Sequence, residues 1–573
     1  MSRPERVGRR ELLLALATSP LAGCCLISKP QPICPFDPAY QNEHSMLTID
    51  VHAHVFNATD LQVRDFITRV STRQIGGIGR LAEFFGGVLE SIGWAAAPDA
   101  AEEMEVLGRL KPDILACNSE RHVAELQTLR ETKYDAAVDE LQVEATRRLP
   151  VIGASMSSLS GPAAELDPEL LGIREILDLP PTYTAFKATV PDSLVGLSDV
   201  EIREVTVKSA LQFVVEMFQY RFVSVYNYLG TYSAGNEQKI DLLTPALVDY
   251  DFWLSRGAAT PSSLPDQMRL MREITILSGG RVHALVPYDP FRQVVHGLGS
   301  SSGFSPIELV RIAVEEQGAI GVKLYPPMGF APYGNGALDV WRSADWLGDV
   351  AQRSDFPSRL DAAMDTLFEY CGRAGVPVMG HSNHSNGPSD AFEALTGPEY
   401  WRQAAEKHDS VNLSFGHFGG AGSTTKGTAP VEEFLQLLLS DHQSGTRRLH
   451  ADASYFSTML EDPTRLRSIL DAIFHFGPDG SNVAVDRLMY GSDWKMLAAE
   501  LASETYLNGF ASIIQSIEQG TGSGSNLTRK FFGLNAARYF GLMRGSANRR
   551  RLERFYDDND MPEPLWMTKV DAA

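Results

Sequence analysis

An α/β fold is expected for this chain, a (β/α)8 TIM barrel with a large, mostly helical insertion between its first and second strands. The first reason is that eight short apolar runs recur along the sequence, and helical patterns separate most of them from the third run onward. Strands that alternate with helices form a parallel sheet, and eight such units close into a barrel. The second reason is length. A chain of 573 residues is too long to form one compact core unless that core is a large barrel with insertions.

Residues 1–24 are expected to be an export signal. They combine an arginine-rich start, an apolar run and small residues before Cys24, which is the layout of a secretory signal. Arg9 and Arg10 before "ELLLAL" resemble a twin-arginine (Tat) signal, and "LAGC" resembles a lipobox that would make Cys24 the lipidated first residue. The expected protein is exported and lipid-anchored at the periplasmic side of the cell envelope, with residues 25–45 as a tether. The alternative is an ordinary cleaved signal.

The barrel is expected to span residues 46–542, which hold all eight apolar runs. These are "MLTIDVHAHVF" from residue 46, "KIDLLTPALV" from 239, "RVHALVPY" from 281, "GAIGVKLYPP" from 318, "VPVMGH" from 376, "VNLSFGH" from 411, "RLHADASY" from 448 and "DRLMYGSD" from 486. One unit is clear around the fifth run, where a helical pattern at 358–373 ends before Gly375 and a strand follows. Cys371 falls on the apolar stripe of that helix, so it is predicted to be buried.

The insertion at residues 60–238 is predicted to be mostly helical. "AAEEMEVLGRL" and "KYDAAVDELQVEATRRL" have helical periodicity, and "GASMSSLSGPAAELDP" is typical of a loop. "LQFVVEMFQYRFVSVYNYL" is the most apolar stretch, but Glu216, Gln219 and Arg221 interrupt it. It therefore indicates a buried amphipathic helix rather than a membrane span. The insertion either covers the active site or is an elaboration without a role in it.

The C-terminal residues 543–573 are expected to be a solvated extension, because three arginines at 549–551 are followed by the acidic "DDND". Composition limits the partners of the whole chain. A net charge of −21 argues against nucleic acid, which requires a basic face. Five cysteines do not form a disulfide framework. The expected partner is a small-molecule substrate, and the expected contact with a membrane is through the lipid anchor only.

Candidate chemical residues stand where the predicted strands end. They are His52, His54, Lys323, His381, His417 and Asp493. The active sites of (β/α)8 barrels form at this end of the strands. Because side chains alternate along a strand, His52 and His54 point to the same side, which is the interior of the barrel. Neutral imidazoles and carboxylates are the ligands of zinc-type divalent metals, so the pattern predicts a metal site.

Five motifs resemble the amidohydrolase superfamily, namely "IDVHAHVF", "GHSNHS", "FGHFGG", "YGSDW" and "KFFGLNAARYFGL". They are most similar to its amidohydrolase-related branch, which includes aminocarboxymuconate-semialdehyde decarboxylase and metal-dependent hydrolases. The resemblance covers the first strand and residues 239–542. It implies that His52, His54, His381 and Asp493 bind a divalent metal, Zn²⁺, as one ion or two. It also implies that His417 either polarises the substrate or binds a second metal.

The expected chemistry follows from this ligand set. Three imidazoles and a carboxylate leave a position for water, whose pKa a divalent ion lowers from about 15.7 to about 7. Asp493 is expected to accept the proton of this water, and His417 to donate a hydrogen bond to the developing oxyanion. Lys323 has three alternative roles: a carboxylated bridge between two metals, a substrate contact, or a member of a buried ion pair. Gly380, Gly416 and Gly491 are expected to permit close approach of backbone and ligands.

Several neighbouring residues have less specific expectations. His384 is expected to be a solvated loop residue, and His283 a structural one low on its strand. Asp249 and Asp251 end the second run and either face the site or bind its loops. Trp494 and Lys495 directly follow Asp493. Both are expected to line the pocket, and packing in the core is the alternative for Trp494.

The predicted function is a metal-dependent hydrolase that activates a metal-bound water to attack a C–N or C–O bond. A non-oxidative decarboxylase on the same site is the alternative. Many decarboxylases of the branch begin with Glu-x-His, whereas this chain has His52 and His54, which favours hydrolysis. A second alternative is a non-catalytic lipoprotein that binds a metal or ligand, and the presence of Asp493, which also serves as a base, argues against it.

Overall fold

The computed structural model divides the chain into two compact units, Met1–Ile33 and Cys34–Ala573. The described residues all belong to the second unit. They are 36, 45–71, 90, 92–116, 120–156, 178–180, 182, 185, 216–233, 238–300, 302–384, 387–422, 431–500, 502–521 and 526–572. The predicted signal and Cys24 lie outside them, as does most of the predicted loop at 153–168.

The described residues form eight strands, one within each of the eight predicted apolar runs. They are β1 (Ile49–Ala53), β2 (Leu242–Pro245), β3 (Leu285–Pro287), β4 (Gly321–Leu324), β5 (Val378–His381), β6 (Leu413–Gly416), β7 (Leu449–Asp452) and β8 (Leu488–Met489). All pairs are parallel. β1 pairs with β2, and β3 to β8 form a six-stranded sheet in sequence order. Every strand residue is buried, as expected for strands covered on both faces.

Backbone contacts also join the two sheets at both edges. Isolated parallel bridges pair Leu243 with Val282 and Ala246 with Leu285, which connects β2 to β3. At the other edge, the Val51 amide donates to the Tyr490 carbonyl at 3.2 Å. β1 therefore lies beside β8 as well as beside β2.

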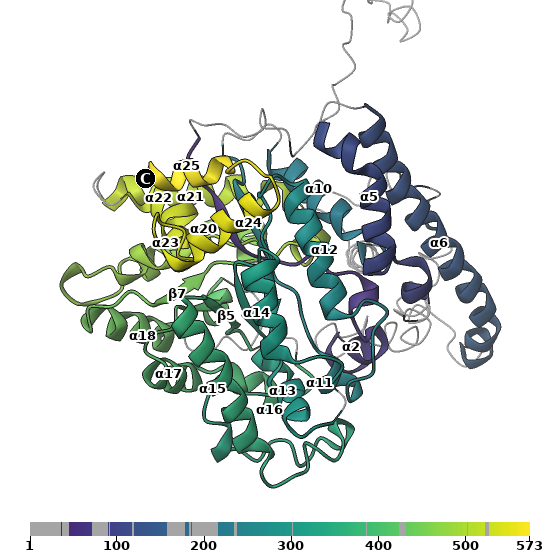
Figure 1. The fold of residues 1–573 in the computed structure, drawn as a ribbon, viewed down its shortest axis with the longest axis horizontal. Coiled ribbons are helices and arrows are strands. Elements are labelled where there is room, and N and C mark those ends of the chain that lie inside the picture. Colours follow the sequence, from purple (N-terminus) through teal and green to yellow (C-terminus); the bar gives the residue numbers. More distant parts are fainter. Residues whose placement is uncertain are drawn as a thin grey trace, which may run out of the picture. The chain divides into compact units, whose positions relative to one another are not determined.

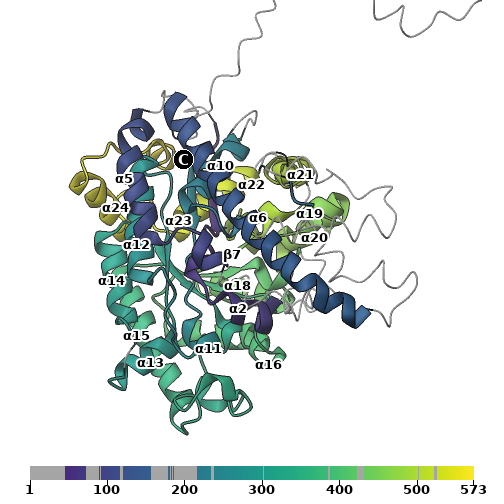
Figure 2. The same cartoon turned by 90° about the vertical axis from the view of Figure 1, so that its right-hand side faces the viewer.

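Helices follow the strands and surround them in both views (Figures 1 and 2). They are α11 (Asp251–Ser255) and α12 (Leu264–Leu277) after β2; α13 (Pro290–Gly297) and α14 (Pro306–Glu316) after β3; α15 (Phe356–Ala374) after β4; α16 (Asp390–Glu393) and α17 (Pro398–Lys407) after β5; α18 (Val431–Gln443) after β6; α19 (Thr458–Glu461) and α20 (Pro463–Phe474) after β7; and α21 (Tyr506–Thr521), α22 (Leu527–Arg529) and α23 (Asn535–Tyr539) after β8.

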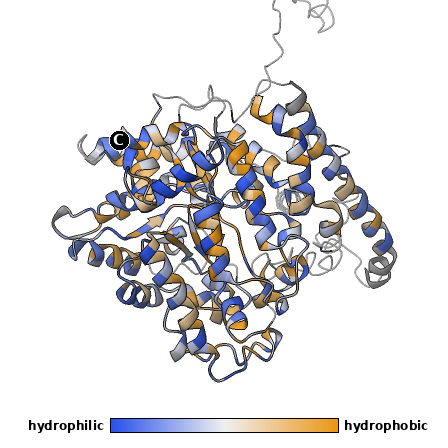
Figure 3. Cartoon of the chain, in the orientation of Figure 1, coloured by the Kyte–Doolittle hydropathy of each residue, from blue (hydrophilic) through white to orange (hydrophobic). Residues whose placement is uncertain are grey.

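The helix α15 shows how the local sequence sets these elements. Its apolar residues recur at helical spacing and include the buried Leu360, Met364 and Cys371. It ends at Gly375, whose φ of 63° is the left-handed conformation that glycine adopts without a steric cost. The predicted helix, its end and the buried Cys371 are confirmed. Figure 3 shows hydrophilic and hydrophobic residues mixed along the surrounding helices, as such amphipathic patterns require.

Between β1 and β2 the described residues are mainly helical. The helices are α2 (Val63–Phe66), α5 (Ala100–Ala116), α6 (Glu120–Met156) and α10 (Arg221–Ser233). α5 lies along α12 in both Figures 1 and 2. α10 is buried along most of its length, as predicted, but it begins only at Arg221. Residues 217–220 form a turn, so the predicted helix over residues 211–229 is confirmed only from Arg221 onward. No helix among the described residues combines the length and apolarity needed to cross a membrane.

Arg221 anchors this inserted region. Its guanidinium binds the carboxylate of Asp60, with 2.8 Å between Nε and Oδ2, and that of Glu103, with 2.9 Å between Nη1 and Oε2. All three side chains have no exposed area. Removing one partner from such a buried group would leave an uncompensated charge, at a cost of roughly 3–5 kcal/mol. The network therefore fixes α5 and the start of α10 to the loop after β1.

The prediction that residues 543–573 are a solvated extension is wrong. They form α24 (Ala547–Asp558) and α25 (Leu565–Asp571), and Trp566 is only 1% exposed. Trp566 donates to the Gly280 carbonyl at 2.8 Å, and Lys569 donates to Asp241 at 2.7 Å. The arginines misled the prediction because their charges are satisfied locally: buried Arg549 binds Glu553 at 2.8 Å. These helices pack against β1, β2 and β3 at the amino ends of the strands.

We expect Trp566→Ala to destabilise the protein by roughly 3–5 kcal/mol, because it removes a fully buried indole and leaves a cavity. Arg544→Ala is the matched control in the same tail, since the Arg544 side chain is 80% exposed. It should change stability by less than about 0.5 kcal/mol. Thermal and urea unfolding midpoints measure both effects. Equal midpoints for Trp566→Ala and the wild type would mean that the tail does not contribute to the fold.

Candidate metal centre

The six predicted site residues come together at the carboxyl ends of the strands. His52 lies in β1 and His54 just beyond it, Lys323 in β4, His381 at the end of β5, His417 after β6 and Asp493 after β8. The exposed fractions are 0% for His52, 2% for Lys323 and His381, 6% for His54 and Asp493, and 7% for His417. Six ionisable side chains thus share one buried space.

The contacts between these residues are short. Nζ of Lys323 donates to Nε2 of His52 at 2.6 Å. Nε2 of His54 lies 3.3 Å from Oδ1 of Asp493, and Nε2 of His52 lies 4.0 Å from the same oxygen. The His417 ring centroid is 4.6 Å from that of His52 and 4.5 Å from that of His381. Each predicted ligand therefore lies against at least one other residue of the set, His381 through its contact with His417.

Hydrogen bonds on the outer side of the rings set the orientation of three imidazoles. Nδ1 of His54 donates to the Ala246 carbonyl at 2.8 Å, and Nδ1 of His417 donates to the Ser454 carbonyl at 3.1 Å. Nδ1 of His52 lies 3.3 Å from both carboxylate oxygens of Asp452. With Nδ1 protonated, Nε2 of each neutral ring is an acceptor on the inner side. That of His52 accepts a hydrogen bond from Lys323.

Asp452 and Ser454 complete this outer layer, and neither was predicted as a site residue. Oδ1 of Asp452 accepts the backbone amide of His417 at 2.9 Å and the Ser454 hydroxyl at 2.5 Å. Oγ of Ser454 lies 2.9 Å from Nδ1 of His52. The signal for Asp452 was present, because it ends the seventh predicted strand at the level of the other ligand types.

Burial controls the protonation of the site. It lowers the pKa of His52 and His381 well below the usual value, that of His54 to about 3, and that of His417 to about 4. The nearby Lys323 charge lowers the pKa of these histidines further. The imidazoles are therefore neutral at neutral pH, which is the form that binds a metal.

Asp493 provides the test of whether these residues fit a cation. Its Oδ1 is buried and accepts no hydrogen bond from any described residue. The nitrogen nearest to it is Nε2 of His54, which is not a donor while Nδ1 holds the ring proton. A buried acceptor that faces another acceptor is costly unless a positive charge lies between them. Ligand atoms of His52, His417 and Asp493 all lie within 4.8 Å of one another. The donor set fits a divalent cation.

Two of the predicted glycines stand directly against His52. A Cβ atom on Gly416 would lie 3.0 Å from Cε1 of His52, and one on Gly491 would lie 3.1 Å from its Cβ. Side chains at these positions would displace the imidazole, which explains why the strand ends carry glycine. Gly380 has a different neighbour, since its Cβ would overlap the Trp401 ring.

The remaining predicted residues lie outside the cluster. His283 is structural as expected, and its Nδ1 donates to the Gly318 carbonyl at 2.7 Å. Asp249 and Asp251 both pair with Arg292 of helix α13, at 2.6 Å each, rather than with a residue of the site or of its loops. His384 is half-buried in its loop, so it is less solvated than expected.

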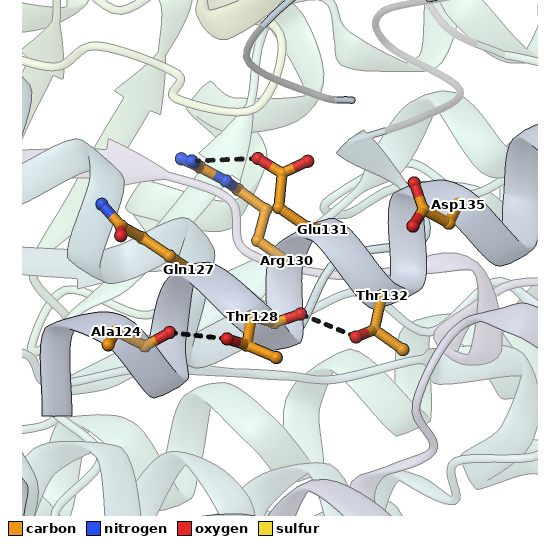
Figure 4. Close-up of a pocket in the computed structure, with 7 residues that line it drawn as sticks. All are labelled: Ala124, Gln127, Thr128, Arg130, Glu131, Thr132 and Asp135. Atoms are coloured by element: carbon orange, nitrogen blue, oxygen red, sulfur yellow. Dashed lines mark hydrogen bonds and ion pairs between the residues drawn. The ribbon is translucent and has the colours of Figure 1, made fainter. Parts of the chain in front are cut away.

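A separate surface hollow of about 480 Å³ lies on α6 and shares no residue with the histidine cluster. Figure 4 shows the polar side chains that line it, including Arg130, Glu131 and Asp135. It contains none of the ligand or acid–base residues singled out in the sequence, and we assign it no chemistry.

Part of the chain is similar to known proteins. The family model for amidohydrolases matches residues 305–542, which contain β4 to β8. The strand-end cluster and this match indicate an enzyme. The match covers less than half of the chain, and over these residues the chain is similar to amidohydrolases. The crystal structure of 5-carboxyvanillate decarboxylase LigW from Sphingomonas paucimobilis is similar at 12% identity and a TM-score of 0.35, over 59% of this chain and 90% of that one. No curated protein matches the sequence.

We expect His52→Ala and His381→Ala each to remove most bound divalent metal, because each deletes an imidazole of the buried cluster. His283→Gln is the matched control, since His283 is equally buried but lies at the amino end of its strand. It should keep the wild-type metal content. Elemental analysis of the folded protein fraction measures the outcome. Full occupancy in both alanine variants would disprove the site.

Proposed function

We propose that this chain is a metal-dependent hydrolase that attacks a C–N or C–O bond of a small molecule. The observation that carries the proposal is the buried Oδ1 of Asp493, which faces imidazole nitrogens and lacks a hydrogen-bond donor among the described residues. His52, His54, His381 and Asp493 would hold a divalent ion, and His417 would bind a second one. Zinc suits a site rich in imidazole. A small-molecule substrate is the expected partner.

The proposed scaffold is a closed (β/α)8 barrel with an insertion between its first two strands. Its support is the pairing of β1 with β2, the bridges from β2 to β3, and the hydrogen bond from Val51 to Tyr490. Two further bonds extend the contact between β1 and the chain after β8. The Asp493 amide donates to the His52 carbonyl at 2.7 Å, and the His54 amide donates to the Trp494 carbonyl at 3.0 Å. These bonds lie at the level of the ligands.

The residues of the site would divide the work between them. A divalent ion, when bound, would supply Lewis acidity to a water molecule and to the substrate. Asp493 would accept the proton of the attacking water and return it to the leaving group. Burial raises the pKa of Asp493 to about 7, which suits a group that must hold a proton transiently at neutral pH.

His417 is better suited to bind a metal than to donate to an oxyanion. Its Nδ1 proton is engaged by the Ser454 carbonyl, so its Nε2 is an acceptor in the neutral ring. Burial lowers its pKa to about 4, which keeps the ring neutral. Of the two roles considered for His417, the geometry supports the ligand role. Lys323, whose Nζ donates to His52, supplies positive charge next to the same ligands.

A substrate panel and one variant test the reaction. The panel spans amides, esters, lactones and aromatic carboxylates, assayed with the purified protein of known metal content. Turnover of an amide, ester or lactone supports hydrolysis. Release of CO₂ from a carboxylate without hydrolysis of the others would instead establish a decarboxylase.

We expect Asp493→Asn to retain much of the metal and to lose at least about 10²–10⁴-fold in kcat, because an amide cannot hold the transferred proton. Asp289→Asn is the control, since Asp289 is a buried carboxylate that caps α13. It should keep its turnover. Kinetics and metal analysis of the same samples separate the roles. Loss of metal together with activity would make Asp493 mainly a ligand, and survival of both would contradict the mechanism.

We also propose that the protein is exported and lipid-anchored at the cell envelope. The support is the sequence alone. Arg9 and Arg10 precede an apolar run, and "LAGC" ends at Cys24, which Cys25 follows. An enzyme that acquires its metal before export would suit a route that carries folded proteins.

We expect Cys24→Ala to abolish labelling by a fatty-acid analogue and to release the protein from the membrane fraction, because the acceptor thiol is lost. Cys25→Ala is the matched control, one residue beyond the lipobox cysteine, and it should stay labelled and membrane-bound. Replacing Arg9 and Arg10 by lysine should block export. A wild type without label would contradict the anchor, and continued export of the double lysine variant would exclude the twin-arginine route.

A further inference from the structure

We propose that the inserted segment at residues 216–233 positions a ligand of the metal centre, because it holds the loop that carries Asp493. The positioning residues are Tyr228, in α10, and Lys495, in the loop. This inference rests on the proposed metal site and goes beyond it, since it gives the insertion a function in that site.

The loop after β8 needs such support because its backbone is strained. Asp493 has a φ of 56° and Lys495 a φ of 86°, and neither is glycine. Left-handed conformations of this kind are costly for residues other than glycine and persist only where surrounding contacts impose them. The position of the Asp493 carboxylate therefore depends on what holds the residues on either side of it.

Residues of the insertion supply that contact on one side of the loop. The Trp494 ring packs edge-on against Tyr228 and Tyr232, with centroids 5.2 and 5.9 Å apart. Nζ of Lys495 donates to the Glu216 carbonyl, and the Lys495 side chain is buried at 2% exposure. Both residues that follow Asp493 are thus held by the segment 216–233. The sequence left open whether Trp494 and Lys495 line the pocket, and the structure shows them bound to the insertion.

A second contact reaches the ligands through Asp50. Its Oδ1 accepts the amides of His52 and Ser492, each at 3.1 Å. The Tyr228 hydroxyl donates to the other oxygen, Oδ2. One carboxylate therefore joins the strand that carries His52 to the residue before Asp493, and Tyr228 fixes the rotation of that carboxylate. Asp50 is fully buried, so water could not replace the Tyr228 hydroxyl as a donor if that hydroxyl were removed.

The segment is itself anchored, so it can act as a fixed support. Arg221 at the start of α10 binds Asp60 and Glu103 in the buried network described above. The backbone before α10 also bonds to the loop after β1. The Ala58 amide donates to the Met217 carbonyl at 2.7 Å, and the Asn57 side chain donates to the Gln219 carbonyl at 3.2 Å.

Tyr228→Phe against Tyr232→Phe is a matched test. Both tyrosines lie on α10, have 0% exposure and pack on Trp494, and both phenylalanine variants keep the ring. Only the hydroxyls differ, since that of Tyr228 binds Asp50 and that of Tyr232 donates to the Ser503 carbonyl at 2.6 Å. Tyr228→Phe should weaken metal binding about 10–100-fold, the usual effect of losing an outer partner of a metal site. Tyr232→Phe should stay within about threefold of the wild type.

The readouts are the dissociation constant for Zn²⁺ from chelator competition and the visible absorption of the Co²⁺-loaded protein. Tyr228→Phe should shift the Co²⁺ bands, and Tyr232→Phe should leave them at the wild-type positions. Lys495→Met removes the contact to Glu216 while keeping the length of the side chain, and it should weaken Zn²⁺ binding in the same direction. Melting temperatures of all variants report whether each one is folded.

Two results would overturn the inference. The first is that Tyr228→Phe and Lys495→Met bind Zn²⁺ as tightly as the wild type, with unchanged Co²⁺ bands. The contacts would then be ordinary packing without an effect on the metal site. Equal losses in Tyr228→Phe and Tyr232→Phe would show that the Asp50 bond has no special effect. A wild type that binds no metal would overturn the proposed metal site itself, so the two failures are distinguishable.

Discussion

Burial of seven ionisable groups in one space is the constraint on which the rest of this structure depends. Four imidazoles, Lys323, Asp452 and Asp493 lie together, and none is more than 7% exposed. Away from water, each polar atom needs a fixed partner or a compensating charge. The outer ring nitrogens of three imidazoles find such partners in Ala246, Ser454 and Asp452. Their inner nitrogens and Oδ1 of Asp493 face one another, and Lys323 donates to only one of them, Nε2 of His52. A divalent cation would compensate the others.

The loops that carry the ligands after the strands have strained backbones, which surrounding contacts must hold in place. His417, Phe418, Asp493 and Lys495 all have positive φ, although none is glycine. These residues follow β6 and β8, whose ends carry two of the candidate ligands. Strained conformations gather at functional sites because the surrounding structure can afford to fix a useful but unfavourable direction there. Asp50 supplies part of that restraint by binding the amides of both His52 and Ser492.

The sequence predicted those features that depend on local pattern. Each of the eight predicted runs contains a strand, and the residues at the run ends meet because parallel strands place their carboxyl ends at one level. Features that depend on partners far along the chain were not predictable. The pairing of Asp452 with His52, and of Tyr228 with Asp50, joins residues separated by 400 and 178 positions. The buried tail was mispredicted for the same reason, since Lys569 is neutralised by Asp241, 328 positions away.

The two ends of the strands have different roles. The C-terminal helices pack at one end and the inserted segment at the other. At the amino ends, α24 and α25 cover apolar residues such as Ile49 and Leu242, a contact that contributes stability without touching a ligand. At the carboxyl ends, the inserted segment makes polar and aromatic contacts with the loop of Asp493. Parallel α/β folds commonly separate stability and chemistry in this way. An insertion at the chemical end that packs against a ligand loop is therefore constrained by the reaction, whereas the tail is constrained only by packing.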